Sequence, residues 1–166
     1  MHELLADLAA LLRQEIDHYR RLLALARRER GRITKGELPG LTQLVRKKEV
    51  ITQDLASVEA SRASLLDRLA KELGEDRAGL TLARVARLAP GEMGEALQAL
   101  LVEFRGVVGQ LIAANDINRS LLDQSLTFVR ESLALFRTVV NTSPTYGKSG
   151  RLGESAPALV ALNHTA

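Results

Sequence analysis

One feature constrains the fold of this chain more than any other: a seam of mostly apolar residues that repeats by four and three, without a slip, over residues 104–139. A spacing of 3.5 residues is typical of a long α-helix in a left-handed coiled coil. The members of the seam are Phe104, Val108, Leu111, Asn115, Asn118, Leu122, Ser125, Val129, Ser132, Phe136 and Val139. The pattern predicts a helix over about residues 92–140 that packs against other helices.

Two more helical patterns precede this seam. Apolar residues recur every three or four positions over residues 3–32 and again over residues 41–73, which keeps them on one face of a helix. Between these stretches lie Gly36, Pro39 and Gly40, and proline is tolerated only in the first turn of a helix. The sequence therefore predicts two long helices joined by a turn within residues 33–40.

A connector rich in glycine and proline separates the second and third long helices. It leaves room for one short helix, Leu82–Leu88, with Thr81 as its N-cap. The helical patterns predict an all-α fold, and the short turns between the long helices favour antiparallel neighbours. This fold is an elongated antiparallel helical bundle or coiled coil of three long helices plus a short connector helix. The bundle should occupy residues 1–141, and residues 142–166, rich in glycine, proline and small polar residues, should form a flexible tail.

Composition agrees with this fold and argues against several classes of protein. Only 3% of the residues are aromatic and there is no cysteine, so neither a large sheet nor a disulfide framework is expected. The first residues lack the basic and apolar regions of a signal peptide, and no run approaches the roughly 20 apolar residues of a membrane span. We expect a soluble, cytoplasmic protein without stable membrane insertion. Its net charge of +3 is too small to predict a partner.

No motif in the chain predicts catalysis. Glu15 and His18 have the Glu-x-x-His spacing that binds two metals in ferritin-like bundles, but the second such pair is missing. Glycine-rich phosphate loops, nucleophile elbows and zinc spacings are also absent from the sequence. We therefore expect neither an enzyme nor a metal site, and no cofactor.

Polar residues interrupt the apolar seams at Lys48, Arg62, Asn115 and Asn118. A buried polar group without a partner costs about 1–3 kcal/mol, so each position needs an explanation. One interpretation is structural: asparagine fixes the register of the helices, and the long basic side chains reach out to water. The other is functional: this part of the seam is open and receives a helix from another protein.

The second half of the last helix is apolar on more than one stripe. Its apolar residues are Leu121, Leu122, Leu126, Phe128, Val129, Leu133, Leu135, Phe136, Val139 and Val140. Two neighbouring helices could not easily cover all of them, and apolar surface that a monomer cannot bury usually marks a protein-protein site. The connector helix, the tail or a second copy of the chain could cover it instead of a different protein.

Basic residues cluster over residues 27–35 and again over residues 46–48. Both clusters could contact phosphate, but Glu29 interrupts the first and no aromatic residue is interleaved for base stacking. Cations also stabilise the C-terminal end of a helix. We interpret both clusters as solvated faces and expect no nucleic-acid partner.

Several segments of the chain have an order and spacing that together resemble a known protein family. The more specific segments are Asn115-x-x-Asn118-x-x-Leu121-Leu122-x-x-Ser125-Leu126-x-Phe128-Val129 and Thr145-Tyr146-Gly147-x-x-Gly150. Less specific ones lie in the earlier helices, at Lys48-Glu49, Arg62-x-x-Leu65-Leu66 and Leu69-Ala70-x-x-Leu73-Gly74. This order and spacing is similar to that of the FlgN family of flagellar export chaperones, and the resemblance extends over about residues 3–150.

This resemblance implies a cytoplasmic bacterial chaperone of type III export that binds hook-filament junction proteins before secretion and aids flagellum assembly. It further implies contact with the flagellar export gate or its ATPase complex. The partner-binding residues that it implies are Asn115, Asn118, Leu122, Leu126, Val129, Leu133, Phe136 and Tyr146. The alternative is a self-associating coiled-coil adaptor without a role in export, which would form a homodimer.

Overall fold

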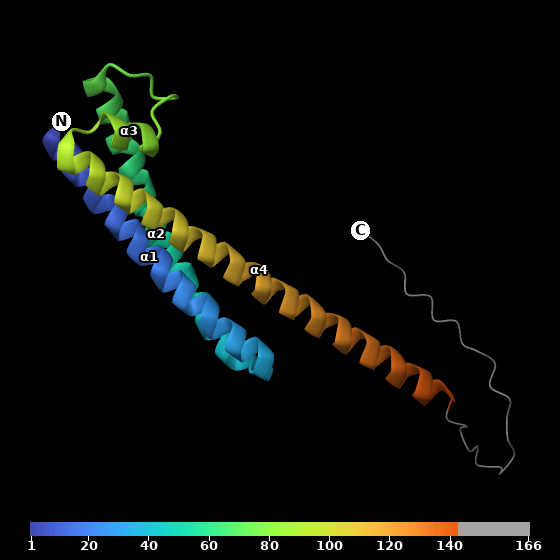
Figure 1. Cartoon of the computed structure of the whole chain (residues 1–166). Helices are drawn as coiled ribbons and strands as arrows, with labels where there is room; N and C mark the ends of the chain where they lie inside the picture. The colour runs from blue at the N-terminus through green and yellow to red at the C-terminus, as the bar shows by residue number, and fades with distance from the viewer. Residues whose placement is uncertain (143–166) are drawn as a thin grey trace, which may run out of the picture. The chain divides into compact units, whose positions relative to one another are not determined.

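A computed structural model describes residues 1–142, the side chains of residue 38 and residues 139–142 excepted (Figure 1). These residues form helices α1 (His2–Lys35), α2 (Leu38–Leu73), α3 (Leu82–Leu88) and α4 (Gly91–Thr142), with no strand among them. The predicted all-α class, with three long helices and one short one, is confirmed.

The turn between α1 and α2 is tighter than the sequence predicted. Gly36 ends α1 with a left-handed φ of 69°, and its amide donates to the carbonyl oxygens of Arg32 and Ile33. Helix α2 begins at Leu38, so Pro39 lies inside its first turn, where no intrahelical partner is lost. Because α2 includes the proline, the turn needs only two residues instead of the predicted eight-residue span.

The chain divides into two compact units, residues 1–123 and residues 124–166. In the first unit, α1 and α2 run antiparallel: Glu15 pairs with Arg62, and further along α1, Glu29 pairs with Lys48, which is earlier in α2. This confirms the antiparallel arrangement that the short turn predicted for this pair.

The first part of α4 completes the bundle and runs in the same direction as α1. Arg20 of α1 forms an ion pair with Glu103, and Arg27 donates to Gln110, seven residues further along both helices. Helix α2 ends beside the start of α1, where Glu72 pairs with the N-terminal amine of Met1, and the connector with α3 turns the chain at that end so that α4 runs back along the bundle (Figure 1). Thr81 caps α3 as predicted, its side chain accepting a hydrogen bond from the Arg84 amide.

Two hydrophobic clusters form the core of the first unit. The first unites the beginning of α1, the end of α2, α3 and the beginning of α4 around Leu8, Leu69 and Val85. The second, around Ala26, lies toward the α1–α2 turn. Tyr19 packs against both clusters and therefore lies where they meet.

The second unit is described over residues 124–142, the last part of α4. The predicted tail, residues 142–166, lies outside the described residues apart from Thr142, which ends α4.

Candidate partner-binding site

Four predicted partner-binding residues of the second unit form one exposed apolar stripe on α4. Leu126 is 54% exposed, Val129 51%, Leu133 57% and Phe136 67%. Their spacing of three, four and three residues places them on the same face of the helix. A structure that leaves such large apolar side chains in water is typical of a surface that a partner covers.

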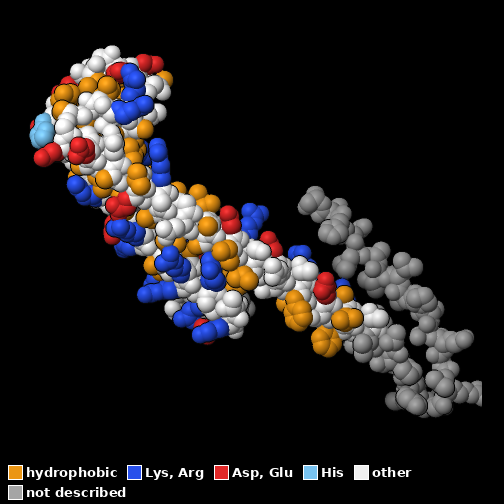
Figure 2. Space-filling view, viewed as in Figure 1, with side chains coloured by type: hydrophobic (Ala, Val, Ile, Leu, Met, Phe, Trp, Pro, Cys, Tyr) orange, Lys and Arg blue, Asp and Glu red, His pale blue; other side chains and the backbone are white. Residues whose placement is uncertain are grey.

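A second stripe, absent from the predicted site, lies beside the first. Phe128 is 70% exposed and Leu135 is 69% exposed, and their spacing of seven residues puts both on one line along α4. Each precedes a member of the first stripe by one residue, which is a rotation of about 100° around the helix. Hydrophobic side chains are visible on this part of α4 in Figure 2. Their seven-residue spacing was the sequence signal for this second stripe.

The remaining described residues of the predicted site lie in the first unit. Leu122 is 39% exposed. Asn115 is exposed, and its side-chain oxygen accepts a hydrogen bond of 3.4 Å from Lys48. Asn118, in contrast, is buried at 3% exposure. Tyr146 lies outside the described residues.

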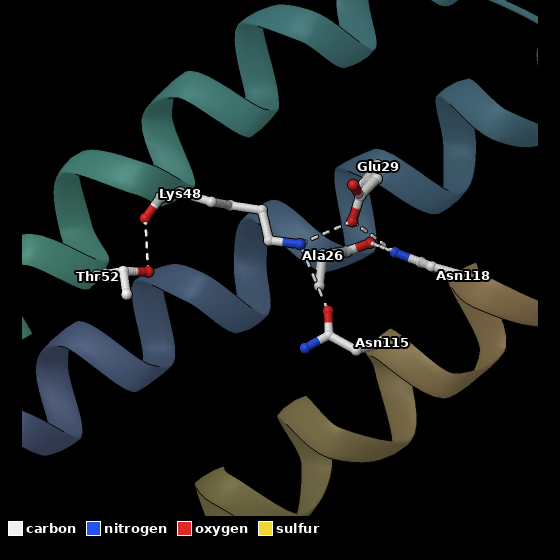
Figure 3. Close-up of polar contacts among 6 residues, drawn as sticks. All are labelled: Ala26, Glu29, Lys48, Thr52, Asn115 and Asn118. Carbon is white, nitrogen blue, oxygen red and sulfur yellow. Dashed lines mark hydrogen bonds and ion pairs between the residues drawn. The ribbon is translucent and has the colours of Figure 1, made fainter. Parts of the chain in front are cut away.

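Asn118 takes part in a polar network that links α1, α2 and α4 (Figure 3). Its amide nitrogen donates to the carbonyl oxygen of Ala26 at 2.8 Å and to Glu29 Oε2 at 2.9 Å. The same Glu29 oxygen accepts from Lys48 Nζ at 2.9 Å. One carboxylate thus joins all three long helices, and this geometry fits the structural interpretation of a seam asparagine, which fixes helix register.

The fourth polar seam residue, Arg62, also has a partner within the bundle. Its Nε donates to Glu15 Oε1 at 2.6 Å, and the Glu15 side chain is fully buried. Burial raises the pKa of the Glu15 carboxyl, while the hydrogen bond and charge of Arg62 act in the opposite direction. Next to this pair, burial and a hydrogen bond to Glu59 raise the pKa of Tyr19 to about 12. Arg62 therefore stabilises the bundle and does not mark an open groove.

Glu15 belongs to the half motif for a metal site. Its carboxylate is held by Arg62, and within residues 1–142 no three histidine, cysteine, aspartate or glutamate side chains group as metal ligands.

Helix α4 is also apolar enough to cross a membrane by length and composition, unlike the other helices in the described residues. Its best 18-residue window has a mean hydropathy of 1.4 and is 22% buried. This finding departs from the expectation that no run of residues is apolar enough for a membrane span. One such helix is weak evidence for a span, because helices of soluble proteins pass the same test. Apolar residues that a protein partner covers would give the same composition.

Comparison with known families identifies the chain. A family model described as FlgN protein matches residues 1–154, which include all four helices. No curated protein and no solved structure matches the chain significantly. The chain therefore belongs to the FlgN family, whose general role is that of a flagellar export chaperone that binds export substrates.

Proposed function

We propose that this protein is a cytoplasmic chaperone of type III export that binds hook-filament junction proteins through the apolar stripe on residues 126–136 of α4. The observation that carries this proposal is the exposure of that stripe, where Leu126, Val129, Leu133 and Phe136 are each more than half exposed.

The stripe is suited to a helix of the cargo. Side chains at intervals of three and four residues form the ridge that packs into the grooves of a second helix, and an amphipathic cargo helix supplies the matching face. Each of these side chains is already partly shielded by its own helix, so covering it contributes about 1–2 kcal/mol. Phe128 and Leu135, on the neighbouring stripe, allow the cargo to wrap around α4 or to present two helices.

The proposed mechanism is binding and release without catalysis. The cargo's apolar helix faces are kept from water and from one another until the export gate or its ATPase complex receives them. The family resemblance assigns Tyr146 to contact with cargo or gate, and this assignment is part of the proposal. No nucleic acid, metal or cofactor is needed at any step.

A second candidate function is self-association as a coiled-coil adaptor. The heptad spacing of the stripe favours it, because identical heptad faces pair in a homodimer. The two candidates use the same residues, and they differ in whether the partner is a second copy of the chain or the cargo.

Size-exclusion chromatography with light scattering distinguishes them. The purified protein is measured alone and mixed with a hook-filament junction protein from the same genome, with Leu126→Asp combined with Phe136→Asp as the test variant. The matched control combines Val102→Asp with Ile112→Asp, which are 72% and 57% exposed on α4 within the first unit. We expect a stoichiometric complex that the test variant loses and the control retains.

Two results would contradict the proposal, the first its function and the second its binding site. If no complex forms and the protein alone is a stable dimer that the test variant dissociates, the adaptor function replaces it. If a complex forms that neither variant affects, the protein is a chaperone whose cargo site is elsewhere.

A further inference from the structure

A groove between α1 and α2 lies on the first unit and involves none of the residues of the α4 stripe. It has a volume of about 520 Å³. Leu25 and Ile51 form its floor and are 8% and 6% exposed, while Val50 on its side is 58% exposed. The groove therefore offers a recessed apolar surface that a few aliphatic side chains of a ligand could fill.

Four cations line the same groove: Arg21 and Arg28 from α1, and Arg46 and Lys47 from α2. No aspartate or glutamate is among its lining residues. All four are exposed, and none forms an ion pair or a side-chain hydrogen bond with another described residue. Lys48, which follows Lys47 on α2, differs from these four cations because it pairs with Glu29 at 2.9 Å.

The cationic surface continues toward the α1–α2 turn. An adjoining hollow of about 320 Å³ shares Arg28 and Lys47 with the groove and adds Arg32 and Lys35, and its one acid, Glu37, is already paired with Arg32. Lysine and arginine side chains gather over this end of the α1–α2 pair in Figure 2. Apart from the Arg32–Glu37 pair, the two hollows together present a margin of cations without acidic partners among their lining residues, next to an apolar floor.

The combination of floor and margin narrows the class of ligand. A nucleic acid would pair with the cations but would leave the apolar floor in water, and no aromatic residue lines the groove to stack on a base. An anionic membrane surface would need apolar side chains that protrude, whereas Leu25 and Ile51 are recessed. A helix with an apolar ridge flanked by acidic residues fits both features, because its ridge enters the groove and its carboxylates reach the margin.

We propose that the groove between α1 and α2 is a second protein-binding site, which takes an acidic amphipathic helix of a partner protein. The apolar ridge of that helix contacts Leu25, Val50 and Ile51, and its carboxylates pair with Arg28 and Lys47. The site is separate from the α4 stripe in residues and in chemistry, so it stands whether or not the stripe binds junction proteins. A chaperone with both sites could contact an acidic partner while cargo occupies α4.

Fluorescence anisotropy with a labelled synthetic peptide tests this site on the full chain. The probe is a helical peptide of about 18 residues with leucine at positions i, i+3, i+4 and i+7 and glutamate on both sides of that ridge. Two comparison peptides have the same leucines scattered around the helix, or lysine in place of glutamate. We expect the probe to bind with a Kd below about 100 µM and both comparison peptides to bind at least about tenfold more weakly.

Charge reversal locates the binding on the protein. Arg28→Glu combined with Lys47→Glu should weaken binding of the probe at least about tenfold. The control, Arg13→Glu combined with Arg105→Glu, makes an equal change of charge at two exposed arginines elsewhere and should change the affinity for the probe by no more than about twofold. Val50→Gln should weaken it several-fold by making the side of the groove polar. The stripe variant, Leu126→Asp with Phe136→Asp, should leave the affinity unchanged. Circular dichroism confirms that each variant retains its helices.

Several results would overturn the proposal. These are no binding of the probe up to about 1 mM, equal loss in both charge-reversal pairs, equal binding of the scattered peptide, or loss of binding in the stripe variant. Binding of duplex DNA or of phosphatidylserine vesicles that depends on Arg28 and Lys47, when the peptide shows no such dependence, would assign the surface to that other ligand.

Discussion

Replacing Arg62 by methionine should destabilise the bundle far more than its position on the helix surface suggests. Arg62 supplies the hydrogen bond to Glu15 Oε1, at 2.6 Å, and the Glu15 side chain is fully buried. The second carboxylate oxygen, Glu15 Oε2, has no hydrogen-bond partner among the residues that the structure describes. Methionine keeps the apolar length of arginine, so the main change is a buried carboxylate left without its counter-charge.

The size of the effect follows from the burial of the two partners. Removing one member of a buried ion pair costs about 3–5 kcal/mol. The Arg62 side chain is 22% exposed, so water can partly replace it, and we expect the lower end, about 3 kcal/mol. Arg68→Met, at an exposed position of the same helix, should change the free energy of unfolding by no more than about 0.5 kcal/mol.

The stability lost in the Arg62→Met variant should depend on pH, and the direction of this dependence follows from the pKa of Glu15. Burial already raises the pKa of Glu15 in the folded protein above its ordinary value of 4.5, and without Arg62 the folded pKa rises further. A raised folded pKa means that the native state binds the proton more tightly than the unfolded chain, so stability falls as pH increases through the folded pKa. The deficit of the Arg62→Met variant should therefore be largest at neutral pH and shrink as pH falls toward 4.5.

Urea unfolding, monitored by far-ultraviolet circular dichroism, measures the free energy of unfolding of each variant and so tests this prediction. With a slope of about 1–3 kcal/mol per molar urea, a loss of 3 kcal/mol lowers the midpoint by about 1–3 M. Adding Glu15→Leu to Arg62→Met should recover most of the stability, because an apolar pair removes the buried charge. The reasoning is refuted if Arg62→Met and Arg68→Met differ by less than about 1 kcal/mol at neutral pH, or if the difference does not change with pH.

Three further changes test other parts of the bundle by the same unfolding assay. Gly31→Ala should stabilise α1 by about 0.5–1 kcal/mol, because the added Cβ would meet no atom within 4 Å. Gly74→Ala should destabilise the protein by about 1 kcal/mol, because Gly74 has a φ of 67°, which strains a residue with a side chain. Equal effects of the two substitutions would contradict this reasoning. Thr81→Ala should cost about 1 kcal/mol through loss of the α3 cap, and no change in the midpoint would show that the cap contributes nothing. Asn118→Leu should cost about 1–2 kcal/mol by removing both hydrogen bonds to α1, and a gain in stability would show that the polar network serves something other than the fold.

The helices themselves could be predicted from the sequence because their causes are local. The apolar period of each stretch, Thr81 before Leu82 and Gly74 after Leu73 all act within a few residues of the helix that they define. One of the two largest differences in boundary, the start of α2 at Leu38, arose at Pro39, which a helix accepts in its first turn as readily as a loop accepts it. Likewise, the apolar surplus on α4 was visible in the sequence as apolar residues on more than one stripe, and in the structure Phe128, Leu135 and the residues of the first stripe are exposed.

The partners of the polar side chains were decided only by the tertiary structure. Asn115 and Asn118 are three residues apart on one seam, yet Asn118 is buried against Glu29 and Asn115 is exposed. Periodicity determines which face of a helix a residue occupies, but it carries no information about the register of the neighbouring helix that covers this face. The Glu15–Arg62 pair joins residues 47 positions apart for the same reason. The basic groove also exists only after folding, because its cations come from two helices that the α1–α2 turn brings side by side.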